Sequence, residues 1–279
     1  MTRADVPVAS AALLADQWGD RRGWFDFVVD APRCHAFVAE DDGDIVGTGV
    51  ASIHGSVAWI GTIWVDSTRR REGLGTALTN ATIDAAETAG SRTLVLVATE
   101  AGRPLYEHLG FEVQSWYVTL EADGLAPSET DQTADGSRHG AGPRLFTPRD
   151  LPAMAGLDRA ATGEDRAHLL AAFAEPGSAR VLDGEDGGIA GFVVRGSWGG
   201  GATIAPSALD ALQILRGRRV AAGPARKVRA GVLADNVEGL ALLTANGWKE
   251  AWRAPRLIRG EPLQWRPTHI WGQFNHALG

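Results

Sequence analysis

The chain has 279 residues, long for one domain of ~150 residues, so two domains are predicted. Hydrophobic residues make up 44% and charged residues 22%, which is typical of a soluble globular protein. No apolar run approaches the ~20 residues of a membrane helix, and Met1–Asp5 does not resemble a signal peptide. The single cysteine, Cys34, excludes an intrachain disulfide and a cysteine-based metal cluster. A net charge of −7 without a long basic stripe argues against nucleic acid as the main partner. We therefore expect a cytoplasmic protein with neither a membrane nor a nucleic-acid partner.

The strands and helices of the first half follow from apolar patterning and turn residues. Strands are predicted over 34–39, 45–53, 57–65 and 93–97, with a turn at Asp41–Asp44. One helix begins near Leu74 and stops at Gly90, and a short one lies between Pro104 and Gly110. Antiparallel strands followed by strand-helix-strand-helix indicate a mixed α/β sheet.

Two short segments occur once in each half of the chain. Thr2–Pro7 parallels Thr147–Pro152, and Leu109–Glu112 parallels Asn246–Lys249. Their equal order and similar spacing indicate a duplicated domain. In the second half a strand over 144–146 precedes the Thr-x-x-Asp helix start, whereas the first half shows no such opening strand. The predicted domains are residues 1–121 and 143–279, joined by a polar linker over 122–142.

The segment from Val65 to Leu78 predicts an anion site. A buried strand ends, a glycine-containing turn follows, and a helix begins there. A helix N-terminus offers main-chain N–H groups and about half a positive charge. Gly73 and Gly75 let the main chain approach an anion, and Arg70 and its neighbours add charge. In physical terms this is a cradle for a pyrophosphate.

Two familiar phosphate loops do not fit this segment. A Walker loop needs a lysine that is missing, and a dinucleotide fingerprint needs a third glycine after Gly75. What remains is the pattern Arg-x-x-Gly-x-Gly on residues 70–75. The alternative is a turn that is rich in glycine by chance and binds nothing. The pattern resembles the coenzyme A loop of the GNAT acetyltransferase superfamily. Gly102–Phe111 is similar to the family's Leu-Tyr-x-x-x-Gly-Phe signature, and the similar region spans residues 36–121.

The resemblance implies acetyl-CoA as the cosubstrate and no metal. It implies that the main chain of Ile63, Trp64 and Val65 binds the pantetheine arm and that Tyr106 is the general acid. The loop residues that it implies for the cofactor are Arg70, Arg71, Gly73, Leu74, Gly75 and Thr76. Many family members carry glycine at the position of Arg71. An arginine tolerates that position sterically only if its φ is negative, so we expect a negative φ there.

The implied activity is N-acetyl transfer to a primary amine of a small molecule. Transfer to a hydroxyl and transfer of a longer acyl group stay open, as does a monomeric or homodimeric state. The general base is not identified, because the strand over 57–65 carries no carboxylate or histidine, and we expect His54 and Glu112 at the surface. Lone histidines elsewhere lack metal-ligand spacing. The alternative is a non-catalytic acyl-CoA-binding sensor or assembly module.

The second half keeps the outline of the first without its loop. Strands are predicted over 180–182, 191–194 and 228–233, and Asp235 is expected to cap a helix that ends at Gly247. Ala205-Pro206-Ser207 replaces the glycine loop. This half resembles the C-terminal domain of bacterial tandem GNAT proteins. The resemblance implies two tandem GNAT-like domains, the second degenerate, each a mostly antiparallel mixed sheet flanked by helices. We expect the second domain to shape the acceptor site, with Arg256 and Trp265 as candidate contributors.

Overall fold

The computed structural model of the chain describes residues 1–127, 142–185, 187–196, 198 and 200–279. They form two compact units. Unit 1 contains Met1–Gln114, Arg256–Pro262 and Asn275–Gly279, and unit 2 contains Ser115–Pro255 and Leu263–Phe274. The predicted domain bounds are continuous in sequence, whereas each unit draws on distant segments. Most of the predicted linker, residues 128–141, lies outside the described residues. No helix in the described ranges has the length and apolar character needed to cross a membrane.

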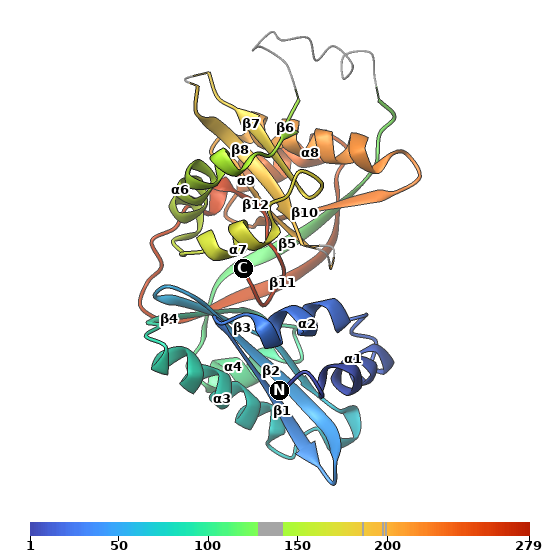
Figure 1. Ribbon diagram of the computed structural model, residues 1–279, viewed down its shortest axis with the longest axis vertical. Coiled ribbons are helices and arrows are strands. Elements are labelled where there is room, and N and C mark those ends of the chain that lie inside the picture. Colours follow the sequence, from blue (N-terminus) through green and yellow to red (C-terminus); the bar gives the residue numbers. More distant parts are fainter. Residues whose placement is uncertain (128–141, 186, 197, 199) are drawn as a thin grey trace. The chain divides into compact units, whose positions relative to one another are not determined.

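Unit 1 is a sheet with helices on both faces (Figure 1). Its strands pair in the order β1-β2-β3-β4-β11, antiparallel throughout except for the parallel pair β3 and β4. The elements are α1 (Val6–Ala15), α2 (Arg22–Asp30), β1 (Cys34–Asp41), β2 (Asp44–His54), β3 (Val57–Val65), η1 (Ser67–Arg69), α3 (Leu74–Thr88), β4 (Thr93–Val97) and α4 (Arg103–His108). The predicted bounds of β3 and β4 are confirmed to the residue.

The sheet of unit 1 is held by an apolar core under α3. Ala58 and Ile60 of β3 pack with Ile83 and Ala86 of α3. Because side chains alternate along a strand, the nearly continuous apolar run of β3 fills this face and supplies the opposite face as well. The helix stops before Gly90, whose φ of +89° favours glycine.

Unit 2 contains an antiparallel five-stranded sheet, in the order β12-β9-β8-β7-β6, and the antiparallel pair β5 and β10. Its strands are β5 (Glu112–Asp123, which starts in unit 1), β6 (Arg144–Leu145), β7 (Ala179–Asp183), β8 (Ile189–Arg195), β9 (Gly201–Ile204), β10 (Lys227–Leu233), β11 (Lys249–Gly260, which continues in unit 1) and β12 (Ile270–Gly272). Its helices are η2 (Pro148–Asp150), α6 (Leu151–Thr162), α7 (Ala167–Phe173), α8 (Ala208–Ala222), α9 (Val237–Ala245) and η3 (Pro267–His269). The predicted mixed α/β class, with two sheets flanked by helices, is confirmed.

The start of each repeat has the same local hydrogen bonds. The main-chain N–H of Thr2 donates to the Asp5 carboxylate at 2.6 Å, and that of Thr147 donates to Asp150 at 2.7 Å. Both threonine hydroxyls donate to the same carboxylates at 3.0 Å. This reciprocal cap stabilises a helix start in each half.

The second landmark is also repeated in three dimensions. Gly110 and Gly247 both have a φ of +83°. The next residue in each half, Phe111 or Trp248, is almost fully buried, and its N–H donates to a carbonyl five residues earlier. This is a glycine-terminated helix end of the Schellman type. The two short sequence parallels therefore correspond to matching structures.

The cap of α9 differs from the prediction, and the start of unit 1 agrees with it. Asn236, not Asp235, caps α9, because its side chain accepts the N–H of Gly239 at 2.9 Å. Asp235 instead accepts a hydrogen bond from Ser115. No strand precedes α1 among the described residues of unit 1; the Met1 ammonium donates to the Ala36 carbonyl of β1 at 2.9 Å.

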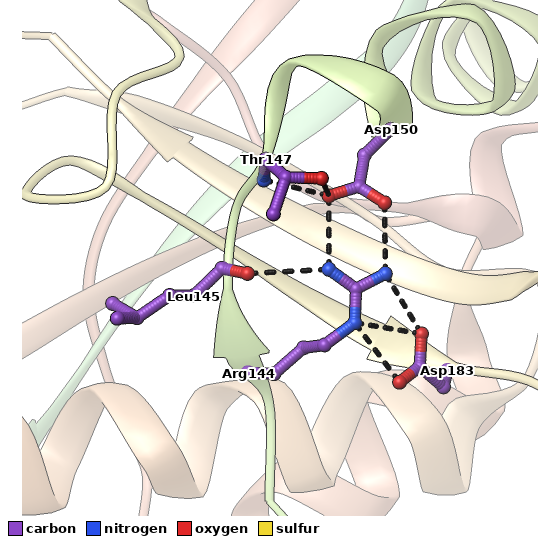
Figure 2. Close-up of polar contacts among 5 residues, drawn as sticks. All are labelled: Arg144, Leu145, Thr147, Asp150 and Asp183. Carbon is purple, nitrogen blue, oxygen red and sulfur yellow. Dashed lines mark hydrogen bonds and ion pairs between the residues drawn. The ribbon is translucent and has the colours of Figure 1, made fainter.

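An arginine fastens β6 of unit 2 to its neighbours (Figure 2). Arg144 of β6 donates two hydrogen bonds to Asp150, at 2.8 and 2.9 Å, and its Nε donates to Asp183 of β7 at 2.9 Å. Arg144 and the Thr147 cap together lower the pKa of Asp150 to about 2, Arg144 having the larger effect. Bidentate arginine pairs are the stronger class of ion pair.

We predict that Asp150→Asn lowers the free energy of unfolding by about 1–2 kcal/mol at pH 7, because the charged hydrogen bonds are lost. The folded-state pKa lies below the unfolded value of about 4, so this contribution is complete above pH 4 and disappears toward pH 2. Thermal unfolding from pH 7 down to pH 2.5 measures it. Asp183→Asn, at a carboxylate that is 58% exposed, serves as the control with a smaller effect. A stability difference between wild type and Asp150→Asn that stays constant with pH contradicts this interpretation.

Candidate active site

The central strand of unit 1 leaves its neighbour halfway along. β3 pairs with β4 only through Val57, Ala58 and Trp59. Beyond Trp59 the β4 side of Ile60–Val65 has no strand partner among the described residues. An edge of this kind presents main-chain N–H and C=O groups to an extended ligand.

A β-bulge at Thr62 redirects the rest of β3. Val50 of β2 pairs with Gly61 and Thr48 pairs with Trp64, so two residues of β3 oppose Gly49 alone. Thr62 has a φ of +53°, which is rare for a β-branched residue. The bulge also shifts the alternation of faces, because Ile63 joins Ile60 in the core under α3.

Two hydrogen bonds hold Thr62 in this conformation. The indole N–H of Trp24 donates to its hydroxyl at 3.0 Å, and the Thr48 hydroxyl donates to its carbonyl at 2.8 Å. Strained backbone of this kind costs about 1–3 kcal/mol and is concentrated at functional sites. Sequence reasoning missed Thr62. The available signal was Gly61-Thr62 inside an otherwise apolar strand.

The loop after β3 leads into α3, whose first main-chain N–H groups have no hydrogen-bond acceptor among the described residues. Asp66 accepts hydrogen bonds from the hydroxyl and the N–H of Thr68, which lower the pKa of Asp66 and close the first turn. Gly73, at φ +87°, then precedes α3 and offers no capping side chain. Within the described ranges, no residue accepts a hydrogen bond from the main-chain N–H groups of residues 71–76. These donors, with the helix dipole behind them, form the predicted anion cradle.

The three arginines of the loop have different partners. Arg69 forms ion pairs with Asp41 and Glu72, and Arg70 donates to Asp16 at 2.9 Å. Asp16 also accepts the indole N–H of Trp64 at 2.8 Å, so Arg70 fastens the base of the loop to α1.

Arg71 is exposed and forms no ion pair with a described residue. Of the three arginines it is therefore the one with a charge available for a phosphate. The expectation of a negative φ at Arg71 is wrong: its φ is +69°. A left-handed conformation costs a non-glycine residue about 1–2 kcal/mol, and a glycine at this position would avoid that strain.

Tyr106 belongs to α4, which adjoins the start of α3. A Cβ added at Gly75 would lie 3.4 Å from Leu105, so α4 adjoins the first turn of α3. Tyr106 packs on the same core as Ile63 and meets Phe111 edge to face at 6.1 Å. Burial raises the pKa of Tyr106 to about 12. The phenol therefore keeps its proton throughout the physiological range.

The structure places the predicted site residues on consecutive parts of unit 1. They are the end of β3 (Ile63, Trp64, Val65), the loop (Arg70, Arg71, Gly73), the first turn of α3 (Leu74, Gly75, Thr76) and α4 (Tyr106).

A general base is not evident beside these residues. Glu112 is exposed as expected. His54 is not at the surface: it is 1% exposed, at the turn between β2 and β3, where β3 is still paired with β4. Within the described ranges, no group of three or more His, Cys, Asp or Glu could hold a metal ion.

Unit 2 lacks both elements of this arrangement. Between β9 and α8 the chain has only Ala205, Pro206 and Ser207, and the Ser207 hydroxyl caps the helix by accepting the N–H of Asp210 at 3.4 Å. At the repeated helix end, the carbonyl that corresponds to that of Tyr106 belongs to Leu243. Among its described residues, unit 2 therefore has no glycine loop before α8, a serine cap at the start of that helix, and a leucine where unit 1 has Tyr106.

Comparison with known proteins gives this arrangement a family. A model described as "Acetyltransferase (GNAT) family" matches residues 8–111. The Bacillus subtilis protein called uncharacterized N-acetyltransferase YitH is 26% identical over 242 residues, covering 85% of this chain and 82% of that protein.

Solved structures match over nearly the whole chain. A Pyrococcus horikoshii protein has a TM-score of 0.79 at 21% identity, covering 100% of this chain and 94% of that one. A GCN5-related N-acetyltransferase from Sphaerobacter thermophilus has a TM-score of 0.63 at 17% identity, covering 94% and 96%. A tandem GNAT protein from the clavulanic acid biosynthesis pathway has a TM-score of 0.56 at 14% identity, covering 94% and 98%. At these identities the likeness shows the fold.

The splayed strand, the open helix N-terminus and the tyrosine of the adjoining helix all lie in the part of the chain that the family model matches. Residues 8–111 match the GNAT family as an acetyltransferase domain, and the protein is an acyltransferase.

Proposed function

We propose that the protein transfers an acetyl group from acetyl-CoA to a primary amine of a small molecule. The observation that carries this proposal is the open anion cradle at the end of a strand whose adjacent edge has no partner. A coenzyme A thioester has both complementary parts, because its pyrophosphate is an anion and its amide-containing arm is extended.

The cradle and the strand edge divide the work of binding. The N–H groups of residues 71–76 hold the pyrophosphate, and the Arg71 guanidinium adds a charge. The pantetheine amides lie along Ile63–Val65, as a further strand does in β-augmentation. Because β-strands rise about 3.3 Å per residue, such an arm brings the thioester toward the Thr62 bulge.

The chemistry then needs little beyond placement and one proton donor. The neutral amine attacks the thioester carbonyl, a C–N bond forms, and the C–S bond breaks to release the coenzyme A thiolate. The ammonium proton leaves to water, and Tyr106 supplies a proton to the thiolate.

The raised pKa of Tyr106 does not exclude this role, because burial opposes the thiolate charge too. Within this chain, burial raises the pKa of the Cys34 thiol to about 11. Burial therefore raises the pKa of the phenol and of the departing thiol in the same direction, which keeps the two matched for proton transfer.

The alternative of a non-catalytic acyl-CoA sensor rests on the absence of an identified base. The matched family and Tyr106 on α4, which adjoins the start of α3, favour the enzyme. A turnover assay with free-thiol detection across a panel of amines separates the two functions, since a sensor binds acetyl-CoA and releases no thiol.

We predict that Gly73→Ala weakens acetyl-CoA binding by about tenfold, because an alanine at φ +87° costs about 1–2 kcal/mol or closes the loop. Gly90→Ala is the matched control: its φ is +89°, and neither added Cβ has a neighbour within 4 Å. Both variants should lose similar stability, while calorimetry shows weaker binding only for Gly73→Ala. Equal affinities for the two variants contradict the cradle.

We also predict that Tyr106→Phe lowers kcat by ~10²–10⁴-fold with little change in acetyl-CoA affinity. The melting temperature should stay within about 2 °C, because the hydroxyl has no recorded partner among the described residues. The wild-type pH–rate profile should show no decline from Tyr106 up to about pH 10, since the required protonated form persists below its pKa. Tyr117→Phe, at the only other tyrosine, is the control. A kcat of Tyr106→Phe within twofold of wild type would contradict the general-acid role and leave Tyr106 with a packing role alone.

A further inference from the structure

A short segment from the far end of the sequence belongs to unit 1. Residues Asn275–Gly279 pack with the first 114 residues. Ala277 and Leu278 are 5% and 0% exposed. The Asn275 side chain accepts the N–H of Ala277 at 2.7 Å, and its carbonyl accepts the N–H of Gly279 at 3.2 Å. The segment is therefore an ordered turn within the unit.

This segment crosses β3 at Gly61. A Cβ added at Gly61 would lie 2.4 Å from the Cβ of Ala277, 2.8 Å from its Cα and 2.9 Å from the carbonyl oxygen of His276. Distances below 3.0 Å do not occur for real side chains, and two of these three atoms are main chain. Glycine within a strand marks a close approach of another backbone. Gly61 is thus the residue that admits the segment.

The contact lies beside the bulge and on the face of β3 away from α3. Gly61 precedes Thr62, and by strand alternation it shares a face with Trp59, whereas Ala58 and Ile60 face the core under α3. The guanidinium of the buried Arg256 lies 5.3 Å from the centre of the Trp59 ring. Arg256, expected to contribute through the second domain, is a residue of unit 1.

An acceptor has one side from which to reach the thioester. The face under α3 is filled by packed apolar side chains, and the β3 edge is used by the cosubstrate. The amine must therefore approach over the opposite face of β3, at the partly exposed Gly61 and not at Trp59, which is fully buried. That is the face on which the segment lies.

We propose that Asn275–Gly279 forms the acceptor-side wall of the transfer site, and that Gly61 is glycine so that this wall can seat against the bulge. The inference rests on the proposed function and assigns to this segment the positioning of the acceptor amine. The wall narrows the opening and keeps water from the thioester. Its one ionisable side chain, His276, is uncharged at neutral pH, because burial chiefly, and Arg21 nearby, lower its pKa to about 4.

The test uses Gly61→Ala, a chain ending after Phe274, and the combination of both. Each protein is titrated with acetyl-CoA in a calorimeter. Thiol release is then measured without an acceptor, where acetyl-CoA and water give acetate and coenzyme A, and with benzylamine, spermidine and a short peptide as acceptors. Amide hydrogen exchange reports whether residues 275–279 remain packed.

Gly61→Ala and the truncation should each raise the KM of the best acceptor by about tenfold and increase acetyl-CoA hydrolysis several-fold, with acetyl-CoA affinity within twofold of wild type. Because both changes remove one interaction, Gly61→Ala should add nothing in the truncated chain. Gly191→Ala is the matched control: its Cβ would meet neighbours in unit 2 at 2.7–2.9 Å, which destabilises a strand without touching the segment.

An unchanged acceptor KM and hydrolysis rate, in a Gly61→Ala protein whose residues 275–279 have lost amide protection, overturns the wall. A lower KM after truncation also overturns it, since the segment then obstructs the acceptor. If the effects of Gly61→Ala and of the truncation on acceptor KM and hydrolysis add up in the combined variant, the wall is overturned as well. A wild-type protein that binds no acetyl-CoA overturns the proposed function as well, whereas wild-type turnover with silent variants overturns the wall alone.

Discussion

The separation of β3 from β4 after Trp59 is the constraint on which the rest of unit 1 depends. A sheet that stayed paired would satisfy its main-chain groups internally and leave no place for an extended ligand. The bulge at Thr62, held by Trp24 and Thr48, redirects β3 at the point of separation. The loop and α3 then follow from the end of that strand, so the strand edge and the anion cradle are placed by one backbone distortion.

Unit 2 repeats local structures of unit 1 but lacks the glycine loop and the tyrosine among its described residues. Its corresponding helix, α8, follows β9 after only three linking residues, and the Ser207 hydroxyl caps it by accepting the N–H of Asp210. Leu243 stands where unit 1 has Tyr106, so the proposed proton donor has no counterpart at that position. Duplicated folds can thus keep their caps and helix ends, which stabilise, while losing the unsatisfied groups that bind. The contrast supports the proposal that the chemistry takes place in unit 1, on physical grounds that do not depend on the family match.

Much of this arrangement could be predicted from the sequence, for reasons that are local. A continuous apolar run bounded by turn residues predicts β3, and the Arg-x-x-Gly-x-Gly pattern predicts an open helix start. The positive φ values of Thr62 and Arg71 could not be predicted, because both go against residue preference; that of Thr62 is held by its hydrogen bonds to Trp24 and Thr48. Nor could the place of Arg256 and Asn275–Gly279 in unit 1, because no local pattern records a contact across more than 150 residues.

The central claim is that the main-chain N–H groups of residues 71–76 bind the phosphates of coenzyme A. Residue-resolved amide hydrogen exchange, with and without saturating acetyl-CoA, tests it most directly, with the serine-capped start of α8 at residues 208–210 as the internal reference. The account predicts strong slowing of exchange at residues 71–76 and along Ile63–Val65, with residues 208–210 unchanged. Saturation with acetyl-CoA that leaves exchange at residues 71–76 unaltered would contradict it.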